Sequence, residues 1–265
     1  VFEDALKACY EAGILGENIF GSEFSCRMYN YFGAGAYICG EETALLNSLM
    51  GELGQPWSKP PFPAIEGLYQ KPTVVNNTET LANVPPIITN GADWYKNIGT
   101  ERSTGPKIVC LSGHVNNPGN YEVEMGMSFR ELVYGENYGG GIPGGKRFKA
   151  LLPSGGSGPI VVDDALDAPI SFEGLDPYGS AMGSASVVVM DETVDMVWAA
   201  MKMVHFFKHE SCGKCTPCRE GTFWMDQLLH KIFHGHGTQK DLDVLKSVAN
   251  QIGGRTLCAL GDFAV

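Results

Sequence analysis

The 265-residue chain is predicted to fold as an α/β protein made of three successive segments. Residues 1–100 alternate helical patterns with short apolar runs, as in an α/β layer structure. Residues 101–190 carry short alternating runs separated by turn residues, which is typical of β-strands. Residues 191–265 repeat apolar residues at helical spacing, and this pattern indicates a helical bundle.

The composition is that of a globular protein with ample material for a core, because 44% of the residues are hydrophobic and 18% are charged. The 34 glycines predict many tight turns or close approaches of the backbone to ligands. The net charge is −11 and no basic cluster occurs, which argues against a nucleic acid as the partner. No stretch reaches the roughly 20 apolar residues that a membrane span requires, so direct insertion into a membrane is not expected.

In the first segment, an amphipathic pattern begins directly after Val1 and stops at Gly13 or Gly16, which predicts a helix. A chain that starts inside an element is expected to be a fragment without its true N-terminus. Residues 27–40, with the sequence RMYNYFGAGAYICG, predict a strand followed by a turn.

Two further helices are predicted in this segment. One runs from Glu41 to Met50 and is closed by Gly51, with acidic residues in its first turn where the helix dipole favours them. The other begins beyond a proline-rich loop, where Asn76 and Glu79 have the spacing of a capping box.

The second segment predicts a small β-grasp domain. Alternating runs at 107–115 and 120–125 flank an Asn-Asn-Pro-Gly turn, which is a strong hairpin signal. A short helix with Ser128 and Glu131 as its capping pair follows, and residues 148–153 predict another strand.

The third segment predicts three helices. The first includes residues 194–204, and the second is expected to present Trp224, Leu228 and Ile232 on one apolar face. The third includes residues 242–252.

The cysteines of the third segment point to a metal cluster. Cys212, Cys215 and Cys218 follow one another at three-residue steps in a loop bent by glycine and proline, and Cys258 lies far along the chain. Three such thiolates can hold three corners of a cubane, and a remote fourth ligand can complete it. Zinc sites more often show two separate C-x-x-C pairs. The motif therefore favours a 4Fe-4S cluster, with zinc and catalytic or structural thiols as alternatives.

The other candidates for metal chemistry are weaker. Lys214 and Arg219 beside the triple either favour the reduced cluster electrostatically or are simply solvated loop charges. His205 and His209 share a helix face at a spacing that could bind metal, but no carboxylate is expected to complete a triad. The remaining cysteines are scattered among apolar neighbours and are interpreted as buried thiols in a reducing compartment: Cys9, Cys26, Cys39 and Cys110.

The chain resembles the NADH-binding flavoprotein subunit family of respiratory complex I over essentially its whole length. Four motifs in the same order carry the resemblance: GAGAYICGEETALLNSLMG, KPPFPAIEGLYQKPTVVNNTETLANVP, ESCGKCTPCREGT and LCALGD. The same signatures recur in the diaphorase subunits of NAD-linked hydrogenases and formate dehydrogenases. The resemblance implies a Rossmann-like FMN and NADH domain at 1–100, an SLBB-like β-grasp domain at 101–190, and a helical 4Fe-4S domain at 191–265.

The resemblance also implies where the flavin and the nicotinamide would lie. It places Tyr37, Gly40, Glu41 and Glu42 along these rings, with Glu42 near the nicotinamide nucleotide. Gly40 lacks a side chain where an aromatic ring must lie against the backbone. A glutamate pair at a helix start is, on its own, also explained by compensation of the helix dipole.

Val75, Asn76, Asn77 and Thr80 correspond to the FMN-binding stretch of the family. Free N–H groups at a helix start suit an anion such as the FMN phosphate, although an asparagine pair at this position is also an ordinary cap.

The remaining implied contacts are with the dinucleotide and between the cluster and the flavin. Phe62 is matched to an aromatic residue that stacks on adenine, and Lys59 is expected to face the dinucleotide. Ala259 and Leu260, next to Cys258, are expected to bring the cluster loop against the flavin.

The chain also departs from the family pattern. The glycine-rich loop and the acidic segment that cradle FMN and NADH would precede Val1, and relatives continue beyond LCALGD, so the site is expected to be incomplete. The tracts YGGGIPGG and PSGGSGP fit neither a Walker A loop nor a dinucleotide fingerprint, and they are interpreted as loops of the β-grasp domain.

The implied function is that of a complex I electron-input subunit, in which hydride passes from NADH to FMN and single electrons then pass to a 4Fe-4S cluster. This chemistry requires no acid–base residue, so none is assigned as catalytic. The implied partners are a thioredoxin-like 2Fe-2S subunit and a large iron–sulfur subunit, in a peripheral arm on the cytoplasmic or matrix face of the membrane. The alternatives are a diaphorase subunit of an NAD-linked or electron-bifurcating hydrogenase or formate dehydrogenase and, more remotely, a zinc-stabilised interaction module.

Overall fold

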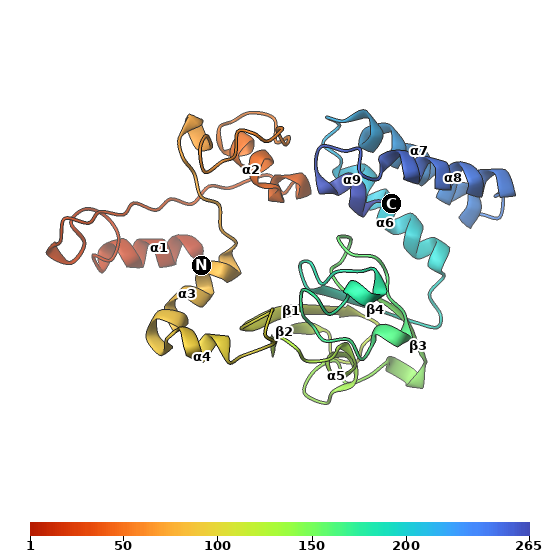
Figure 1. Cartoon of the computed structure of the whole chain (residues 1–265), viewed down its shortest axis with the longest axis horizontal. Helices are drawn as coiled ribbons and strands as arrows, with labels where there is room; N and C mark the ends of the chain where they lie inside the picture. Colours follow the sequence, from red (N-terminus) through yellow and green to blue (C-terminus); the bar gives the residue numbers. More distant parts are fainter.

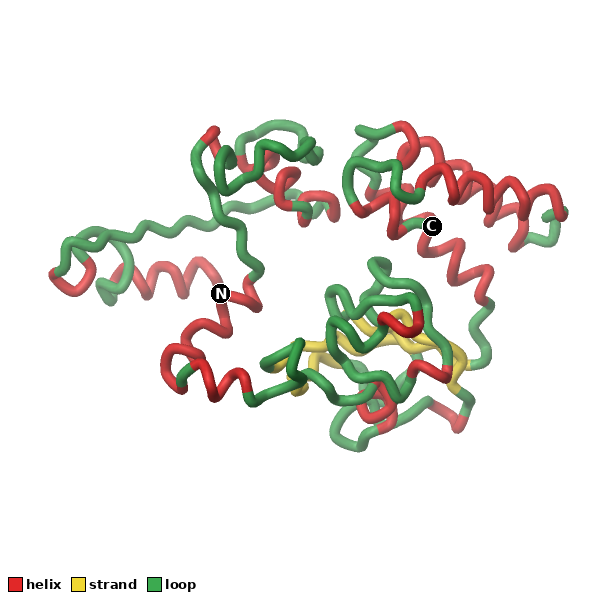
Figure 2. The backbone as a smooth tube through the Cα atoms, in the orientation of Figure 1, coloured by secondary structure: helices red, strands yellow, loops and turns green.

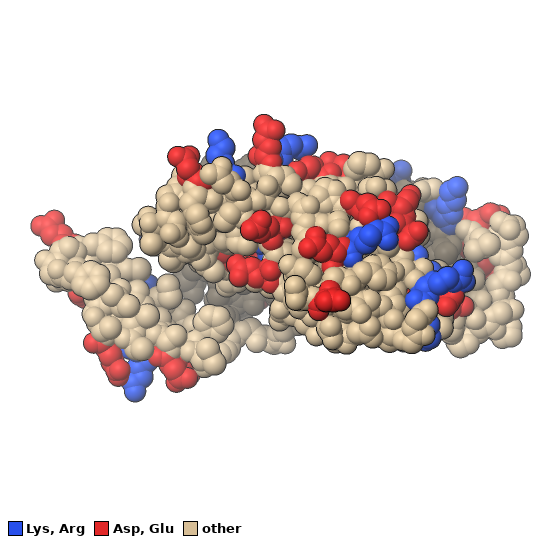
Figure 3. Space-filling model, turned by 90° about the horizontal axis from the view of Figure 1, so that it is seen from below, with Lys and Arg blue, Asp and Glu red and all other residues tan.

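The computed structural model describes residues 1–265 as three parts that follow one another along the chain. Figure 1 shows the N-terminal part in red to orange, the sheet in yellow-green to green, and a set of helices in blue. Helix α6 (Met196–Glu210) leads from the sheet to the other blue helices. On the face shown in Figure 3, lysine and arginine side chains are interspersed with aspartate and glutamate.

The N-terminal part contains the helices that the sequence predicts. They are α1 (Phe2–Glu11), α2 (Glu42–Leu49) and α3 (Thr78–Asn90), and they are followed by a short helix that was not predicted, α4 (Ala92–Lys96). Helix α2 ends as expected before Gly51, which has a φ of +81° that favours glycine. The cap of α3 is one residue later than predicted, because the Asn77 side chain, not that of Asn76, accepts the hydrogen bond from the Glu79 N–H.

The predicted strand in residues 27–40 is wrong. These residues form an extended loop that ends in a 3₁₀ turn at Tyr37–Gly40, and Figure 2 shows the long loop in green. Residues 27–37 are exposed and lie beside no other strand. An extended segment becomes a strand only when a neighbour pairs with its N–H and C=O groups. The alternation of strands and helices expected for residues 1–100 is therefore absent, and this part consists of helices and loops.

The middle part is a four-stranded mixed sheet in the order β2-β1-β4-β3. The strands are β1 (Pro106–Gly113), β2 (Gly119–Glu124), β3 (Phe148–Leu152) and β4 (Ser186–Asp191). The central pair, β1 and β4, is parallel, and both outer pairs are antiparallel. Helix α5 (Phe129–Tyr134) buries Phe129, Leu132 and Val133 in the same core as the sheet. This is the arrangement of a β-grasp fold, and the predicted hairpin, short helix and later strand are confirmed.

The last part is a helical bundle, as predicted. Besides α6 it contains α7 (Thr216–Phe233), α8 (Gln239–Ile252) and the short α9 (Ala259–Phe263). The predicted face of α7 is shifted, because Trp224 is exposed whereas Met225 and Leu229 are buried. The buried stripe also contains Thr222 and Asp226, polar residues that a search for apolar periodicity passes over. None of the helices has the length and hydropathy that a membrane crossing requires.

Candidate functional site

The four cysteines singled out by their spacing come together where the bundle meets α2. Helix α6 ends at Glu210, and the following loop carries Cys212 and Cys215 to the start of α7. Cys218 is buried in the first turn of α7, and Cys258 directly precedes α9. These side chains pack in one small cluster with Phe207, Leu260 and the α2 residue Ala44: Cys212, Cys215, Cys218 and Cys258. All eight cysteines of the chain are free thiols, so this quartet is available to a metal.

The surroundings of the four cysteines disfavour deprotonated thiols that have no metal bound to them. Burial is the main reason that the pKa of Cys218 is raised, and the neighbouring cysteines raise it further, while the Ser211 hydroxyl 3.3 Å away lowers it. Burial likewise raises the pKa of Cys258. Bound metal ions favour deprotonated thiols and would offset both effects, so the donor set fits a thiolate-bound metal cluster.

Hydrogen bonds fix the loop that carries the first cysteines. Gln55 donates a 2.8 Å hydrogen bond from its side chain to the Cys212 carbonyl. Arg219 donates to the Gly213 carbonyl at 2.7 Å, and Lys214 donates to a carbonyl of the proline-rich loop. Lys214 and Arg219 are thus more than solvated charges, because both hold the loop in place.

A cavity of about 310 Å³ lies beside the cysteines. Its lining is largely apolar and consists of Tyr37, Ile38, Gly40, Glu41, Cys258, Ala259, Leu260 and Phe263. A Cβ at Gly40 would meet no atom within 4 Å, so the backbone is open there to a flat ligand. The structure therefore brings five of the residues predicted to bind cofactor together with a cysteine of the quartet. No sequence pattern indicated Ile38 or Phe263, although Phe263 directly follows the LCALGD motif.

Tyr37 connects this cavity to the bundle. Its N–H donates a 3.0 Å hydrogen bond to the Glu210 carboxylate, and its ring meets that of Phe206 edge to face at 5.1 Å. Burial, and secondarily the charge of Glu210, raises the pKa of the Tyr37 hydroxyl. Glu210 was not predicted, although it is the first residue of the ESCGKC motif.

Glu41 and Glu42 have structural partners. One carboxylate oxygen of Glu41 caps α2 by accepting 2.9 Å hydrogen bonds from the N–H groups of Thr43 and Ala44. Glu42 forms an ion pair with Lys59, and this bond is the main reason that the pKa of Lys59 is raised. Lys59 is also 3.8 Å from Glu41, so the three predicted residues form one charged group at the start of α2.

Other predicted residues lie outside this cavity. Phe62 is exposed and does not line it. Val75, Asn76, Asn77 and Thr80 are exposed around the start of α3, and Asn77 and Thr80 line a different cavity of about 440 Å³ that also includes sheet residues. The structure thus separates the predicted phosphate-binding stretch from the cavity at Tyr37.

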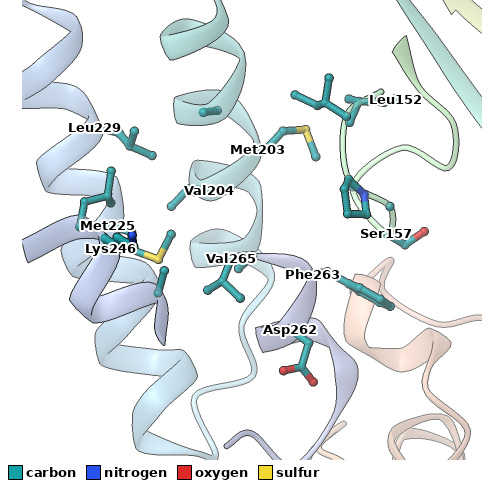
Figure 4. Close-up of a pocket in the computed structure, with 18 of the residues that line it drawn as sticks. Leu152, Ser157, Met203, Val204, Met225, Leu229, Lys246, Asp262, Phe263 and Val265 are labelled. Carbon is teal, nitrogen blue, oxygen red and sulfur yellow. The ribbon is translucent and has the colours of Figure 1, made fainter. Parts of the chain in front are cut away.

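A further apolar cavity lies between the bundle and residues 152–160. It measures about 500 Å³, and Figure 4 shows Met203, Val204, Met225 and Leu229 among its lining side chains. None of the predicted site residues lines it.

The fold and the site define an iron–sulfur protein whose cysteine quartet adjoins a cavity suited to a flat ligand. Three family models match in succession: the Nuo51 FMN-binding domain at residues 2–86, the SLBB domain at 108–162, and the NADH-ubiquinone oxidoreductase-F iron–sulfur binding region at 198–265. Together the three matches make the chain similar to the FMN-binding, iron–sulfur subunits of NADH-quinone oxidoreductases.

Individual relatives agree with this assignment. The chain is 49% identical over 261 residues to the F subunit of the NADH-quinone oxidoreductase of Mycobacterium bovis, and the match covers 98% of the chain and 58% of the relative. It is 50% identical over 262 residues to an F subunit of the NADH-quinone oxidoreductase of Rhizobium meliloti, covering 99% of the chain and 62% of the relative. The chain thus spans about three fifths of the length of these relatives.

A solved structure is also similar. It is an NAD+-reducing [NiFe]-hydrogenase in the air-oxidized state, with a TM-score of 0.80 and 39% identity. The match covers 88% of this chain and 40% of the hydrogenase chain.

Proposed function

We propose that this chain forms part of the electron-input subunit of an NADH-quinone oxidoreductase, with NADH as substrate and FMN and one 4Fe-4S cluster as cofactors. The observation that carries the proposal is that Cys258 belongs to the cysteine quartet and also lines the cavity at Tyr37 and Gly40. A ligand in that cavity would lie directly beside a cluster held by these cysteines, and such contact allows electrons to pass between them.

In this proposal, the thiolates of Cys212, Cys215, Cys218 and Cys258 hold the cluster. The Gln55 and Arg219 hydrogen bonds keep the cysteine loop in one conformation. Three of the four cysteines come from one loop and helix start, so the position of α9 decides whether the fourth can complete the set.

The flavin ring is assigned to the cavity wall made by Tyr37, Gly40, Ala259 and Leu260. A bound flavin supplies two-electron oxidation of NADH coupled to one-electron reduction of an iron–sulfur cluster. The protein excludes water there with apolar side chains and aligns the ring against the Gly40 backbone. This alignment requires no proton transfer by a side chain, so we assign no acid–base residue.

The nucleotide contacts are assigned to the polar groups around α2 and α3. Glu41, Glu42, Lys59 and Phe62 are proposed to meet the dinucleotide. The exposed N–H groups at the start of α3 are proposed to bind the FMN phosphate, and the residues assigned to this role are Val75, Asn76, Asn77 and Thr80. The residues assigned to the dinucleotide lie apart from those assigned to the FMN phosphate, so substitutions in the two groups should have separate effects.

The domain division and the assembly are also proposals. The helices and loops of 1–100, the sheet region of 101–190 and the bundle of 191–265 would be the flavin, β-grasp and cluster domains. The partners would be separate iron–sulfur subunits, including a thioredoxin-like 2Fe-2S subunit and a larger one, in a peripheral arm on the cytoplasmic or matrix face. The similarity to an NAD+-reducing hydrogenase supports a diaphorase subunit as the second candidate.

Metal analysis of the chain purified without oxygen tests the cluster. We expect iron and inorganic sulfide in equal amounts and an EPR signal after reduction with dithionite. Stoichiometric zinc without sulfide would contradict the proposal and support the zinc-stabilised alternative.

The full-length protein tests the electron-input role. It should reduce ferricyanide with NADH but should not reduce quinone, because electrons must leave through partner clusters. Robust quinone reduction by the isolated subunit would instead indicate a self-contained quinone reductase.

A further inference from the structure

A second group of metal-binding side chains lies between α6 and α7, away from the cysteines. His205 comes from α6, and Asp226 and His230 come from α7. Their ligand atoms all lie within 4.8 Å of one another. The sequence paired His205 with His209, but the structure instead groups His205 with Asp226 and His230 of the neighbouring helix, a set that no sequence pattern indicated. We propose that His205, Asp226 and His230 bind a Zn²⁺ ion.

The two distances from the histidines to the carboxylate are close to those of a tetrahedral site. His205 Nδ1 is 3.1 Å and His230 Nε2 is 3.8 Å from the same oxygen, Asp226 Oδ1. With zinc bonds of about 2.0–2.1 Å, neighbouring ligand atoms lie about 3.3 Å apart. The distance from His205 Nδ1 to Asp226 Oδ1 is already close to this value, and His230 Nε2 needs to move about 0.5 Å closer to the same oxygen. Both imidazoles can move, since their side chains are 58% and 45% exposed.

The carboxylate is held in position before any ion binds. The Asp226 side chain is only 2% exposed, and Lys208 donates a 2.7 Å hydrogen bond to its Oδ2. This bond leaves Oδ1 directed toward the histidines, and such outer partners commonly orient metal-binding carboxylates. The positive charge of Lys208 also repels a cation and therefore lowers the affinity of the site for Zn²⁺.

The chemistry of the donors selects the metal. Two imidazoles and one carboxylate, with a fourth position open to water, are typical of zinc and related borderline metals such as Ni²⁺ and Co²⁺. Calcium and magnesium prefer sites made of oxygen ligands. Asp226 and His230 are four residues apart on α7 and therefore share a face, as helical metal pairs do.

The site would join the two helices that flank the cysteine loop. Asp226 follows Cys218 on α7 by about 12 Å along the helix axis, so a zinc ion there is separate from the cysteine quartet. Its effect would be to fix α6 against α7.

Zinc titration of the cluster-loaded chain against a competing chelator tests the site, because the cluster then occupies the four thiols. We expect one zinc equivalent to bind. Zinc-edge X-ray absorption should show nitrogen or oxygen ligands near 2.0 Å and no sulfur near 2.3 Å, the approximate bond lengths of these ligands. If the thiols carry zinc instead of a cluster, sulfur ligands also appear in the spectrum, but the weaker binding of one zinc equivalent by His230→Gln still reports the second site, so the test does not depend on the proposed function.

His230→Gln should weaken zinc binding by about tenfold or more, as loss of a metal-site contact typically does. His236→Gln is the matched control, because His236 lies beyond the end of α7. The zinc affinity of this variant should be unchanged. No stoichiometric binding, or equal affinity of His230→Gln and the original chain, would overturn the proposal.

Discussion

The Tyr37 backbone N–H donates a 3.0 Å hydrogen bond to the Glu210 carboxylate, across 173 residues of sequence. Glu210 is the last residue of α6, directly before the cysteine loop, and Tyr37 begins the turn that lines the cavity. This bond is one of several contacts that connect the N-terminal part to the segment that carries the cysteines. The two halves of the candidate site are therefore positioned relative to each other by a contact that no local pattern encodes.

Glu210→Ala should loosen this connection. We expect faster amide hydrogen exchange over Tyr37–Gly40, because the acceptor of the Tyr37 N–H is lost. Glu210→Gln keeps an acceptor oxygen and should show a much smaller effect. Equal exchange in both variants and the original chain would show that the bond does not hold the turn.

Cys258→Ala should abolish the cluster as completely as Cys215→Ala, despite its distance along the chain. A cubane that lacks one thiolate is labile, and Cys258 packs in the same cluster as the other three cysteines. EPR of the dithionite-reduced variant is the measurement, with Cys110→Ala on β1 as the control. An unaltered 4Fe-4S signal in Cys258→Ala would remove this residue from the ligand set.

Glu42→Gln in the full-length protein should change the NADH kinetics without loss of flavin. The substitution breaks the ion pair with Lys59 and alters the charge where the nicotinamide nucleotide is proposed to lie. Asn77→Ala tests the opposite role and should lower flavin content, because it removes the cap that orders the start of α3. If Glu42→Gln loses flavin while the NADH kinetics stay the same, the two roles are assigned the wrong way round.

Asp191 should make the sheet lose stability as the pH falls through the acidic range. A hydrogen bond from Thr193 is the largest of several contacts, including Lys146 and His114, that lower the pKa of Asp191 to about 2. A lowered pKa in the folded state stabilises the fold above the unfolded value of about 3.9, and this contribution is lost as the pH falls toward 2.

Urea unfolding at several pH values checks this expectation. Asp191→Asn should be less stable than the original chain at neutral pH, and the difference should shrink as the pH falls below about 4. Asp164→Asn, at an exposed position, should show little difference at any pH. A stability difference for Asp191→Asn that does not vary with pH would show that the carboxylate charge is not what matters.

The sequence by itself determined the features that depend on neighbouring residues. The helix from Glu41 closed by Gly51, the Ser128 cap and the hairpin at the Asn-Asn-Pro-Gly turn are set by local capping and turn chemistry, which acts over a few residues. The even spacing of the cysteine triple is similarly visible without a structure.

Tertiary structure decided the features that depend on distant partners. The strand predicted in residues 27–40 pairs with no other strand, and Asn77 rather than Asn76 became the cap of α3. The Asp226 carboxylate reaches His205 only because α6 packs against α7. Strand pairing, contacts between helices and the linkage of Tyr37 to Glu210 require groups far apart in the chain to meet. Only the packing of the whole fold determines which of them do.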